Sequence, residues 1–427
     1  MRIAMLSYHT CPLATLGGKD TGGMNVYVRE LTRYLGRIGV GVDVFTRSQD
    51  EHVPHVSHDL GYGNRVVHVR AGPEVPLPKE ELVGFLPEFV QGIQDFASTK
   101  ELPYDLIHSH YWMSGIAAGG LKSAWGVPVV HMFHTLGLMK QRVARQPGEA
   151  EGEYRLQGEK QVLELADRIV AATPAEVAQL QWLYQANTGK VVVIPPGVDI
   201  SRFYPIPMDE AKENIGVPPC EKALLFVGRV EPLKGIDNLI EAIALMRKQD
   251  VRVCLSVIGG DPDCGPETVN AEQLRLKELR EAAGLVDTVI FLGKRDQDTL
   301  PYYYSAVEAV VVPSHYESFG MVALEAMACG TPVVASQVGG LAFLVQDGVT
   351  GFTVPVDDAQ ALAERLSQLV QEPGLRQKLG KQAAEFARQY AWETISNKIF
   401  DLYQEVLDSN GAIAKNNSAV LYDSAAH

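Results

Sequence analysis

Two glutamates eight residues apart, Glu317 and Glu325, are the leading candidates for chemistry in this sequence of 427 residues. They lie in the run HYESFGMVALEA at 315–326, where a helix is expected to begin after a β-branched stretch. If the run is helical throughout, a rise of about 1.5 Å per residue separates the two residues by about 12 Å. A retaining glycosidase needs its carboxylates about 5 Å apart, so this spacing does not favour a pair that flanks one bond. It favours two carboxylates that hold distant parts of one extended ligand.

Groups that could bind phosphate lie beside these glutamates and in a second loop. Ser318, Phe319 and Gly320 would present backbone N–H groups at the helix start, where the helix dipole favours negative charge. Arg229 and Lys234 share a short loop after a strand-like run. A guanidinium can bind two phosphate oxygens, and an ammonium adds a compact positive charge beside it. Each pattern alone is weak, because surface cations are usually only solvated, but their position after a strand favours a diphosphate site.

A glycine-rich segment at 17–25 follows the first strand-like run and precedes a helix-like stretch. Glycines let the backbone approach a ligand closely, and the helix start offers N–H groups to negative charge. The segment does not have the G-x-G-x-x-G spacing of a dinucleotide-binding turn, which counts against a nicotinamide-dependent oxidoreductase. From this segment alone, a flexible connector is an equally good interpretation.

Short β-branched runs alternate with longer amphipathic segments along the chain, which predicts stacked βαβ units. The strand-like runs are at 3–7, 42–46, 65–69, 106–109, 127–132, 168–171, 191–194, 223–228, 251–258, 288–292, 309–312, 332–335 and 351–354. The Pro-Pro-Gly run at 195–197 is the most rigid break between them. We therefore predict an α/β protein with two doubly wound, Rossmann-like domains that face each other across a cleft. The predicted limits are 1–197 and 198–391, with a last helix over 392–407 that returns to the first domain and a flexible tail over 408–427.

The composition is that of a globular protein, with 46% hydrophobic and 21% charged residues. Lys and Arg number 38 against 52 Asp and Glu, and a net charge of −14 disfavours binding to nucleic acid or an anionic membrane surface. The most apolar long window, 115–133, is interrupted by Lys122 and Pro128, so no membrane span is expected. Five scattered cysteines favour a reducing, cytoplasmic compartment, without a disulfide framework or a zinc site.

Taken together, these motifs resemble the family 4 glycosyltransferases, which have the GT-B fold. Glu317 and Glu325 match the E-x7-E element of that family, and Arg229 and Lys234 fall where it keeps an Arg/Lys pair. The PGVD run at 196–199 resembles its interdomain turn. The runs GGMNVYV at 22–28 and HSHYW at 108–112 are similar to the branch that contains sucrose-phosphate synthases and D-inositol-3-phosphate glycosyltransferases. The resemblance covers nearly the whole chain, up to about residue 407.

The resemblance implies a role for each matching residue. Glu317 would bind hydroxyls of the donor sugar, Glu325 would bind the ribose of UDP, and His134 would lie beside the transferred sugar. Arg229 and Lys234 would stabilise negative charge on the departing diphosphate. The implied catalytic residues are His134, Glu317, Arg229 and Lys234. The implied donor-binding residues are Gly23, Arg229, Lys234, Glu317, Ser318, Phe319, Gly320, Met321 and Glu325. The implied acceptor-binding residues are Gly22, Asn25, Lys79, Tyr111, Thr135 and Arg155.

The same resemblance implies retention of anomeric configuration without a carboxylate nucleophile, the leaving diphosphate taking the proton of the acceptor. No paired acids suit double displacement. Asp-x-Asp runs at 261–263 and 296–298 have the spacing of a metal motif, but we interpret them as loop acids, because Arg229 and Lys234 can supply the positive charge. We therefore expect no metal and no cofactor, with the UDP-sugar as a substrate.

The acceptor is the least determined part of the prediction. A sugar phosphate is favoured over a lipid or a protein, since Lys79, Tyr111, Thr135 and Arg155 match positions that bind an acceptor phosphate. Local motifs resemble the inositol-phosphate branch, whereas sucrose-phosphate synthases are more widely spread among organisms. The expectation leans narrowly to UDP-glucose and fructose 6-phosphate, with D-inositol 3-phosphate N-acetylglucosaminyl transfer and a non-catalytic nucleotide-sugar-binding protein as alternatives. A monomer and a homodimer fit equally well, without integral membrane contact.

Overall fold

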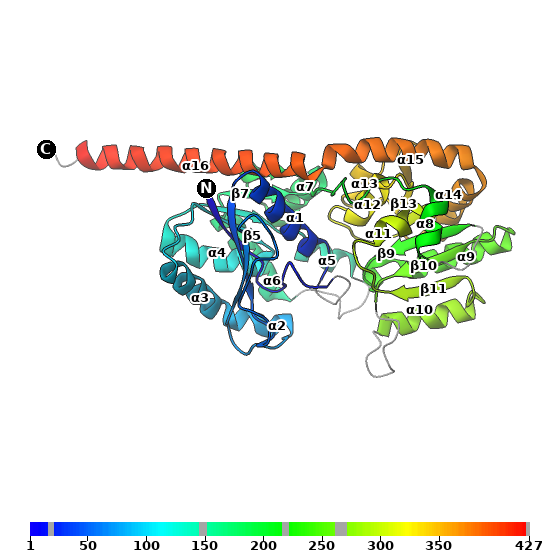
Figure 1. Ribbon diagram of the computed structural model, residues 1–427, viewed down its shortest axis with the longest axis horizontal. Coiled ribbons are helices and arrows are strands. Elements are labelled where there is room, and N and C mark those ends of the chain that lie inside the picture. Colours follow the sequence, from blue (N-terminus) through cyan, green and yellow to red (C-terminus); the bar gives the residue numbers. More distant parts are fainter. Residues whose placement is uncertain (16–20, 145–151, 216–221, 261–270, 424–427) are drawn as a thin grey trace.

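The computed structural model describes residues 1–15, 21–144, 152–215, 222–260 and 271–423. These residues form two α/β units side by side, each built on a mainly parallel sheet with helices on its faces (Figure 1). The last helix, in red, lies along the first unit, in blue and cyan. The structure therefore confirms the predicted pair of doubly wound units.

The first unit holds an eight-stranded sheet in the order β3-β4-β2-β1-β5-β6-β7-β8, in which β3 and β4 pair antiparallel. Its strands are β1 (Arg2–Leu6), β2 (Gly41–Arg47), β3 (Val56–Ser57), β4 (Arg65–Val69), β5 (Leu106–His110), β6 (Val129–Met132), β7 (Arg168–Ala171) and β8 (Val191–Val193). Its helices are α1 (Gly23–Arg37), α2 (Lys79–Leu82), α3 (Leu86–Thr99), α4 (Trp112–Trp125), α5 (Gly137–Val143), α6 (Glu153–Leu165) and α7 (Pro174–Tyr184), with short 3-10 turns η1 (Val83–Phe85) and η3 (Thr188–Lys190).

The second unit holds a six-stranded parallel sheet in the order β11-β10-β9-β12-β13-β14. Its strands are β9 (Ala223–Val227), β10 (Cys254–Ile258), β11 (Val289–Gly293), β12 (Ala309–Val312), β13 (Val333–Ser336) and β14 (Gly351–Val354). The helices after residue 207 are α8 (Met208–Ile215), α9 (Ile236–Lys248), α10 (Ala271–Ala282), α11 (Leu300–Ser305), α12 (Met321–Ala328), α13 (Leu341–Leu344), α14 (Ala359–Gln371), α15 (Pro373–Ala387) and α16 (Trp392–Asp423), with 3-10 turns η4 (Pro232–Lys234) and η5 (Arg388–Tyr390).

In both sheets the strand order reverses next to the strand that comes first in the chain. β1 lies between β2 and β5, and β9 lies between β10 and β12. At such a reversal the loops after the two neighbouring strands diverge and open a crevice at their carboxyl ends. The Arg/Lys loop follows β9, and the E-x7-E run follows β12. The HSHYW run covers the end of β5 and the start of α4, and the described end of the glycine-rich segment, residues 21–25, leads into α1. The two topologies therefore gather the predicted motifs at two crevices.

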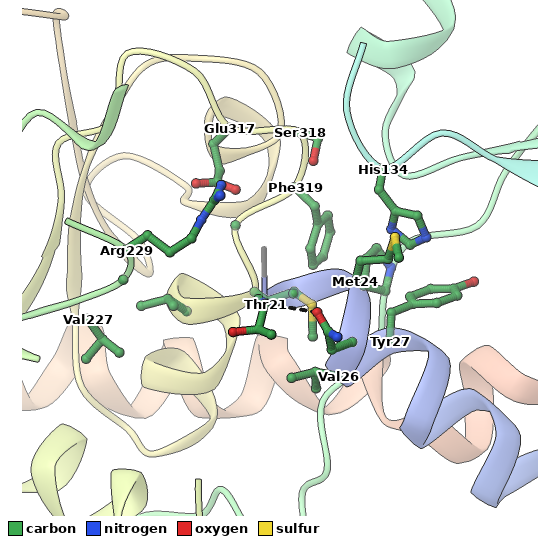
Figure 2. A pocket seen from close by; sticks show the side chains of 18 of the residues that line it. Thr21, Met24, Val26, Tyr27, His134, Val227, Arg229, Glu317, Ser318 and Phe319 are labelled. Atoms are coloured by element: carbon green, nitrogen blue, oxygen red, sulfur yellow. Dashed lines mark hydrogen bonds between the residues drawn. The ribbon is translucent and has the colours of Figure 1, made fainter. Parts of the chain in front are cut away.

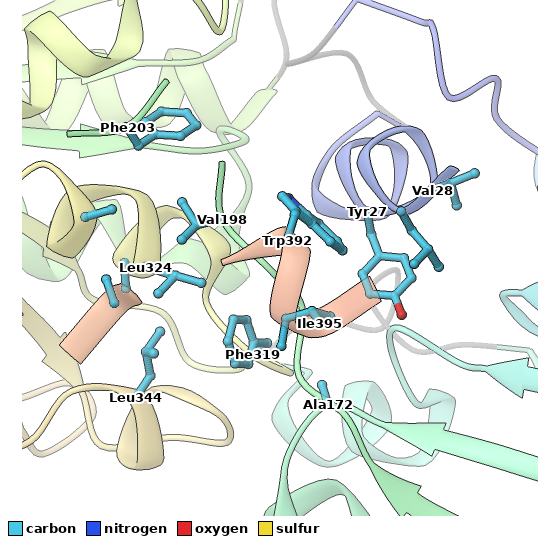
Figure 3. Packing of buried hydrophobic residues seen from close by; sticks show 14 of the residues in the cluster. Tyr27, Val28, Ala172, Val198, Phe203, Phe319, Leu324, Leu344, Trp392 and Ile395 are labelled. Carbon is cyan, nitrogen blue, oxygen red and sulfur yellow. The ribbon is translucent and has the colours of Figure 1, made fainter. Parts of the chain in front are cut away.

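The end of the chain packs back on the first unit. Val198 forms a parallel bridge with Ala391, just before α16 begins. The indole of Trp392 lies edge-on to Tyr27, with ring centroids 5.4 Å apart, and stacks on Tyr34 at 6.5 Å; both tyrosines belong to α1. One apolar cluster joins these residues to buried side chains of the second unit (Figure 3). This cluster holds the two units and α16 together.

The length of the last helix differs from the prediction. We expected a helix over 392–407 and a loose tail from 408, whereas α16 continues to Asp423. The added segment contains no proline, and its single glycine, Gly411, costs only about 1 kcal/mol relative to alanine in a helix. No residue in this segment therefore stops the helix.

The sequence predicts no disulfide framework, and one cysteine departs from this expectation. Cys254 is disulfide-bonded, whereas Cys11 and Cys329 are not. Spacing along the sequence could not reveal this bond, because it does not fix which cysteines lie close together in the fold. Among the described residues, none of the helices combines the length and apolarity that a membrane span requires.

Candidate active site

A cavity lies between the two units, where the loops after β1, β5, β9 and β12 meet. In Figure 2, Arg229 and Glu317 of the second unit lie on one side, and His134 and Tyr27 of the first unit lie on the other. Fifteen of the sixteen predicted site residues, all of them described, line this cavity: Gly22, Gly23, Asn25, Lys79, Tyr111, His134, Thr135, Arg229, Lys234, Glu317, Ser318, Phe319, Gly320, Met321 and Glu325. Arg155 is the exception.

An ion pair joins two of the residues predicted to be catalytic, Lys234 and Glu317. Lys234 Nζ donates to Glu317 Oε2 over 2.6 Å, and both side chains are mostly shielded from solvent. The following Gly235 has a φ of +64°, and a Cβ at this position would lie 2.1 Å from the carbonyl oxygen of Pro313. Only glycine fits this turn, which presses η4 against the end of β12 and holds Lys234 beside Glu317.

Two further glycines, Gly339 and Gly340, support Glu317 from behind. The backbone N–H of Gly340 donates to the carbonyl oxygen of Glu317 over 3.0 Å. Gly339 has a φ of +44°, and a Cβ there would lie 2.0 Å from the same carbonyl oxygen. Sequence analysis did not identify these two glycines, because nothing in their spacing links them to Glu317.

The phosphate-binding candidates surround this ion pair. Arg229 pairs with Glu231 at 2.9 Å, and its side chain is about a third exposed. Ser318 and Phe319 lead to Gly320, which begins α12 with a φ of +102°. The amides at the start of α12 have no preceding turn to accept from them, so they can donate to an anion in the cavity.

Glu325 lies one turn and a half into α12 and is buried. Its carboxylate accepts a hydrogen bond from the Tyr304 hydroxyl of α11 over 2.8 Å. Burial raises the pKa of Glu325 to about 7, although hydrogen bonds from Tyr304 and Gln297 act in the opposite direction. A carboxyl group with this pKa is partly protonated near neutral pH, so it can both donate to and accept from ligand hydroxyls.

His134 occupies a strained turn directly after β6 and faces the cavity. Its φ is +62°, an uncommon conformation for a residue other than glycine, and it costs about 1–3 kcal/mol. Its Nε2 lies 3.0 Å from Nδ1 of His110, the last residue of β5. Burial lowers the pKa of His134 to about 3, so its imidazole is neutral at physiological pH.

Arg155 lies behind the cavity wall and contacts the residues that form it. Its Nη2 donates to the carbonyl oxygen and to Oγ1 of Thr135, at 2.9 and 3.0 Å, and its guanidinium lies over the ring of Tyr111 at 5.0 Å. Its Nε donates to Glu159 Oε1 over 2.9 Å, and neither side chain is more than 1% exposed. Glu159 is on the same helix and holds the guanidinium away from the cavity. The role of Arg155 in acceptor binding stays a prediction.

Asn25 links Gly22 to the residues that follow β1. Its side-chain amide donates to Thr10 Oγ1 and to the carbonyl oxygen of Cys11, at 2.7 and 2.8 Å, and its Oδ1 accepts from the backbone N–H of Gly22 over 2.9 Å. These contacts hold Thr10, Cys11 and Gly22 around the start of α1. Through Asn25, Gly22 is held at the cavity wall.

Several cavity residues were absent from the predicted set. The His9 ring lies 4.4 Å from that of Tyr111, and Thr21, Lys140 and Gln297 also line the cavity. Lys140 had a signal in the sequence, since the segment that contains it is rich in cations within an acidic chain. His9 had none apart from its place after β1.

The Asp-x-Asp run at 296–298 joins the two units. Arg202 pairs with Asp298 at 3.2 Å and donates to Gln297 Oε1 over 2.9 Å, and Gln297 also accepts from Arg29 of α1. The run at 261–263 lies outside the described residues. Within the described parts of the chain, no group of three His, Cys, Asp or Glu residues could hold a metal ion.

Comparison with known proteins gives matches over nearly the whole chain. Residues 21–202 match "Glycosyltransferase Family 4", and residues 207–386 match "Glycosyl transferases group 1". A D-inositol 3-phosphate glycosyltransferase from Actinosynnema mirum is 42% identical over 95% of this chain and 98% of its own. A second such enzyme, from Catenulispora acidiphila, is 41% identical over 96% of each chain.

Solved structures show the same likeness. A sucrose-phosphate synthase from Thermosynechococcus elongatus superposes with a TM-score of 0.87 and 36% identity, over 96% of this chain and 99% of that one. The lipopolysaccharide glycosyltransferase WaaG superposes with a TM-score of 0.68 and 20% identity, over 94% of this chain and 99% of that one. At that identity the likeness to WaaG concerns the fold alone.

Proposed function

The chain belongs to the family 4 glycosyltransferases of the GT-B fold, and from this premise we propose that it transfers a hexosyl group from a UDP-sugar to a small phosphorylated polyol or sugar, with retention of configuration. The observation that carries this proposal is the composition of one cavity. Lys234, Arg229 and the start of α12 meet there with Glu317 from the second unit, opposite His134 from the first.

The cavity wall formed by the second unit suits a nucleoside diphosphate sugar. Arg229, Lys234 and the α12 amides supply positive charge and hydrogen-bond donors for two phosphates. Lys234 pairs with Glu317 in this structure, so a diphosphate that binds Lys234 competes with Glu317 for its ammonium. Glu317 then becomes available to accept hydrogen bonds from sugar hydroxyls. Glu325, further along α12, is placed for the ribose.

The proposed reaction breaks the bond between the anomeric carbon and the diphosphate oxygen, and forms a bond from that carbon to an acceptor oxygen on the same face. The departing phosphate oxygen takes the proton of the acceptor hydroxyl. Negative charge grows on the diphosphate as it departs, and Arg229 and Lys234 stabilise it most at that stage. A neutral His134 donates a hydrogen bond to the transferred sugar without giving up its proton.

The wall from the first unit suits a phosphorylated acceptor. Lys79 and Lys140 line it together with the polar groups of Tyr111 and Thr135, in a chain whose net charge is −14. Cations placed at one wall of an otherwise acidic protein favour an anionic ligand there. A free polyol or an uncharged glycan would not use them.

For the acceptor, the relatives favour an inositol phosphate over fructose 6-phosphate, which reverses the order expected from the sequence. The D-inositol 3-phosphate glycosyltransferases are 42% and 41% identical to this chain, against 36% for the sucrose-phosphate synthase. Fructose 6-phosphate stays the second candidate because the synthase superposes over almost its full length.

The test is product formation from UDP-N-acetylglucosamine with inositol 3-phosphate and from UDP-glucose with fructose 6-phosphate, including both crossed pairings. Transfer in the first pairing supports the proposed acceptor, and transfer only to fructose 6-phosphate supports the second candidate. Tight UDP-sugar binding without turnover in any pairing would refute the proposed activity and favour the non-catalytic alternative.

A further inference from the structure

Four histidines lie on or just after β5 and β6, and the proposed reaction uses only His134. His108 and His110 lie on β5, His131 lies on β6, and His134 follows β6. We propose that His110 is a positioning residue that fixes the tautomer of His134, so that His134 carries its proton on Nδ1 and presents this N–H to the transferred sugar. This inference rests on the proposed function.

The geometry of the pair is specific. His110 Nδ1 lies 3.0 Å from His134 Nε2, and Tyr27 packs edge-on against both rings, with centroids 5.5 and 5.2 Å away. His110 is fully buried, whereas His134 is partly exposed and lines the cavity (Figure 2). With Nε2 engaged by His110, Nδ1 is the ring nitrogen of His134 that remains for a ligand.

Hydrogen-bond accounting determines which ring donates. A neutral imidazole carries one N–H and one bare nitrogen, so one of the two facing nitrogens donates and the other accepts. His110 Nε2 is buried and has no hydrogen-bond partner within the described residues. A buried N–H without a partner is rarer in proteins than a buried acceptor without one. His110 therefore carries its proton on Nδ1 and donates it to His134, and its bare Nε2 is the atom left without a partner.

The tautomer of His134 follows directly. Because Nε2 of His134 accepts from His110, its single proton is on Nδ1. The opposite arrangement would bury an unpaired N–H on His110 and leave His134 with only a lone pair toward the sugar. A hydrogen-bond donor placed in advance holds a hydroxyl of the transferred sugar in position, without rearrangement, while the bond to the diphosphate breaks.

The position of His110 is itself supported by the returning helix α16. The ring of His108 packs on that of His110, with centroids 4.3 Å apart. His108 Nδ1 lies 2.6 Å from the hydroxyl of Tyr403, which is buried in α16. The contacts thus extend from Tyr403 through two imidazoles to His134. Both histidines of the HSHYW run therefore take part in these contacts, because residues two apart on a strand point to the same face of β5.

The test uses two His110 variants and one matched control. His110→Leu removes the donor, and His110→Asn keeps an N–H close to the position of Nδ1. His131→Leu is the control, because His131 is equally buried on the next strand but bonds to Ser109 at 2.8 Å and not to His134. We expect His110→Leu to lower kcat at least about tenfold, with KM for both substrates and UDP affinity within about twofold of the parent. His110→Asn and His131→Leu should keep most of kcat.

A second measurement does not depend on turnover or on the folding of a His110 variant. Long-range ¹H–¹⁵N spectra of the parent protein distinguish the two histidine tautomers, and His134→Asn assigns the signals of His134. We expect a protonated Nδ1 and a bare Nε2. A proton on Nε2 of His134, or an unchanged kcat in His110→Leu, would overturn the inference. Absence of transfer by the parent would refute the proposed function instead, and would leave the tautomer measurement intact.

Discussion

The ion pair between Arg155 and Glu159 offers a sharp test of how the cavity wall is held. Glu159 is fully buried and accepts from Arg155 Nε at 2.9 Å, from the Gly137 N–H at 3.0 and 3.1 Å, and from the Tyr184 hydroxyl. Glu159→Gln keeps the size of the side chain and removes its charge. The buried guanidinium of Arg155 would then lose the charge of Glu159, and breaking a buried ion pair by removing one partner costs about 3–5 kcal/mol. We expect a fall of this size in the free energy of unfolding.

Urea unfolding followed by circular dichroism would measure the loss. A double variant, Glu159→Gln with Arg155→Met, removes both charges and should regain most of the lost stability, because an apolar replacement for a buried pair is often neutral. Glu176→Gln at pH 6 is a matched control. Glu176 is also buried in the first unit, accepts from the Ala172 N–H at 2.8 Å, and has its pKa raised to about 7 by burial. It is therefore mostly uncharged at pH 6, and its amide variant should lose little.

The reasoning fails if Glu159→Gln loses less than about 1 kcal/mol, or if the double variant loses the sum of the two single losses. Additive losses would mean that Arg155 and Glu159 act independently, despite their contact. With the proposed function, the same single variant should raise the KM for the acceptor while leaving UDP affinity unchanged, because Arg155 holds Thr135.

Three further predictions concern the second unit. With the proposed function, Lys234→Ala should lower kcat about 100-fold or more and change the KM of the acceptor little, since its charge would stabilise the departing diphosphate. Equal turnover in steady-state assays would contradict this role. The pKa of Glu325 is raised to about 7, so the stability that its neutral form contributes is present below about pH 4.5 and is lost as the pH rises to about 7. Parallel unfolding titrations should show this loss, at most about 3 kcal/mol, in the parent and not in Glu325→Gln. Gly235→Ala should destabilise far more than Gly284→Ala: both glycines have a φ near +65°, but only the first Cβ would meet the Pro313 carbonyl, and comparable melting temperatures would refute the proposed clash.

The sequence predicted most of the elements and the residues of the second unit that line the cavity, because both depend on local patterns. β-branched runs located nearly all of the strands, and the short antiparallel β3 was missed since two residues carry no periodic signal. Arg229 and Glu317 were identifiable because parallel sheets place ligands at the carboxyl ends of their strands, where both residues lie.

Contacts between distant segments were not predictable in the same way. Glu159 looks like an ordinary helix residue until Gly137 and Tyr184 are brought to it by the folding of separate segments. The pairing of His110 with His134 depends on the register of β5 with β6 and on a left-handed turn, and neither is encoded by spacing. From the sequence we expected Arg155 at the cavity. Its pairing with the buried carboxylate of Glu159, behind the cavity wall, could not be predicted from the sequence.

The return of α16 to the first unit has a consequence for dissecting this enzyme. Trp392 and Tyr403 fill space against Tyr27, Tyr34 and His108, although nearly two hundred residues separate them from the rest of that unit. A fragment that ends at the interdomain turn would expose these aromatic and imidazole surfaces to water. Separate expression of the first unit would therefore need α16 attached to it. The helix could be joined after the interdomain turn, or placed before β1 by circular permutation.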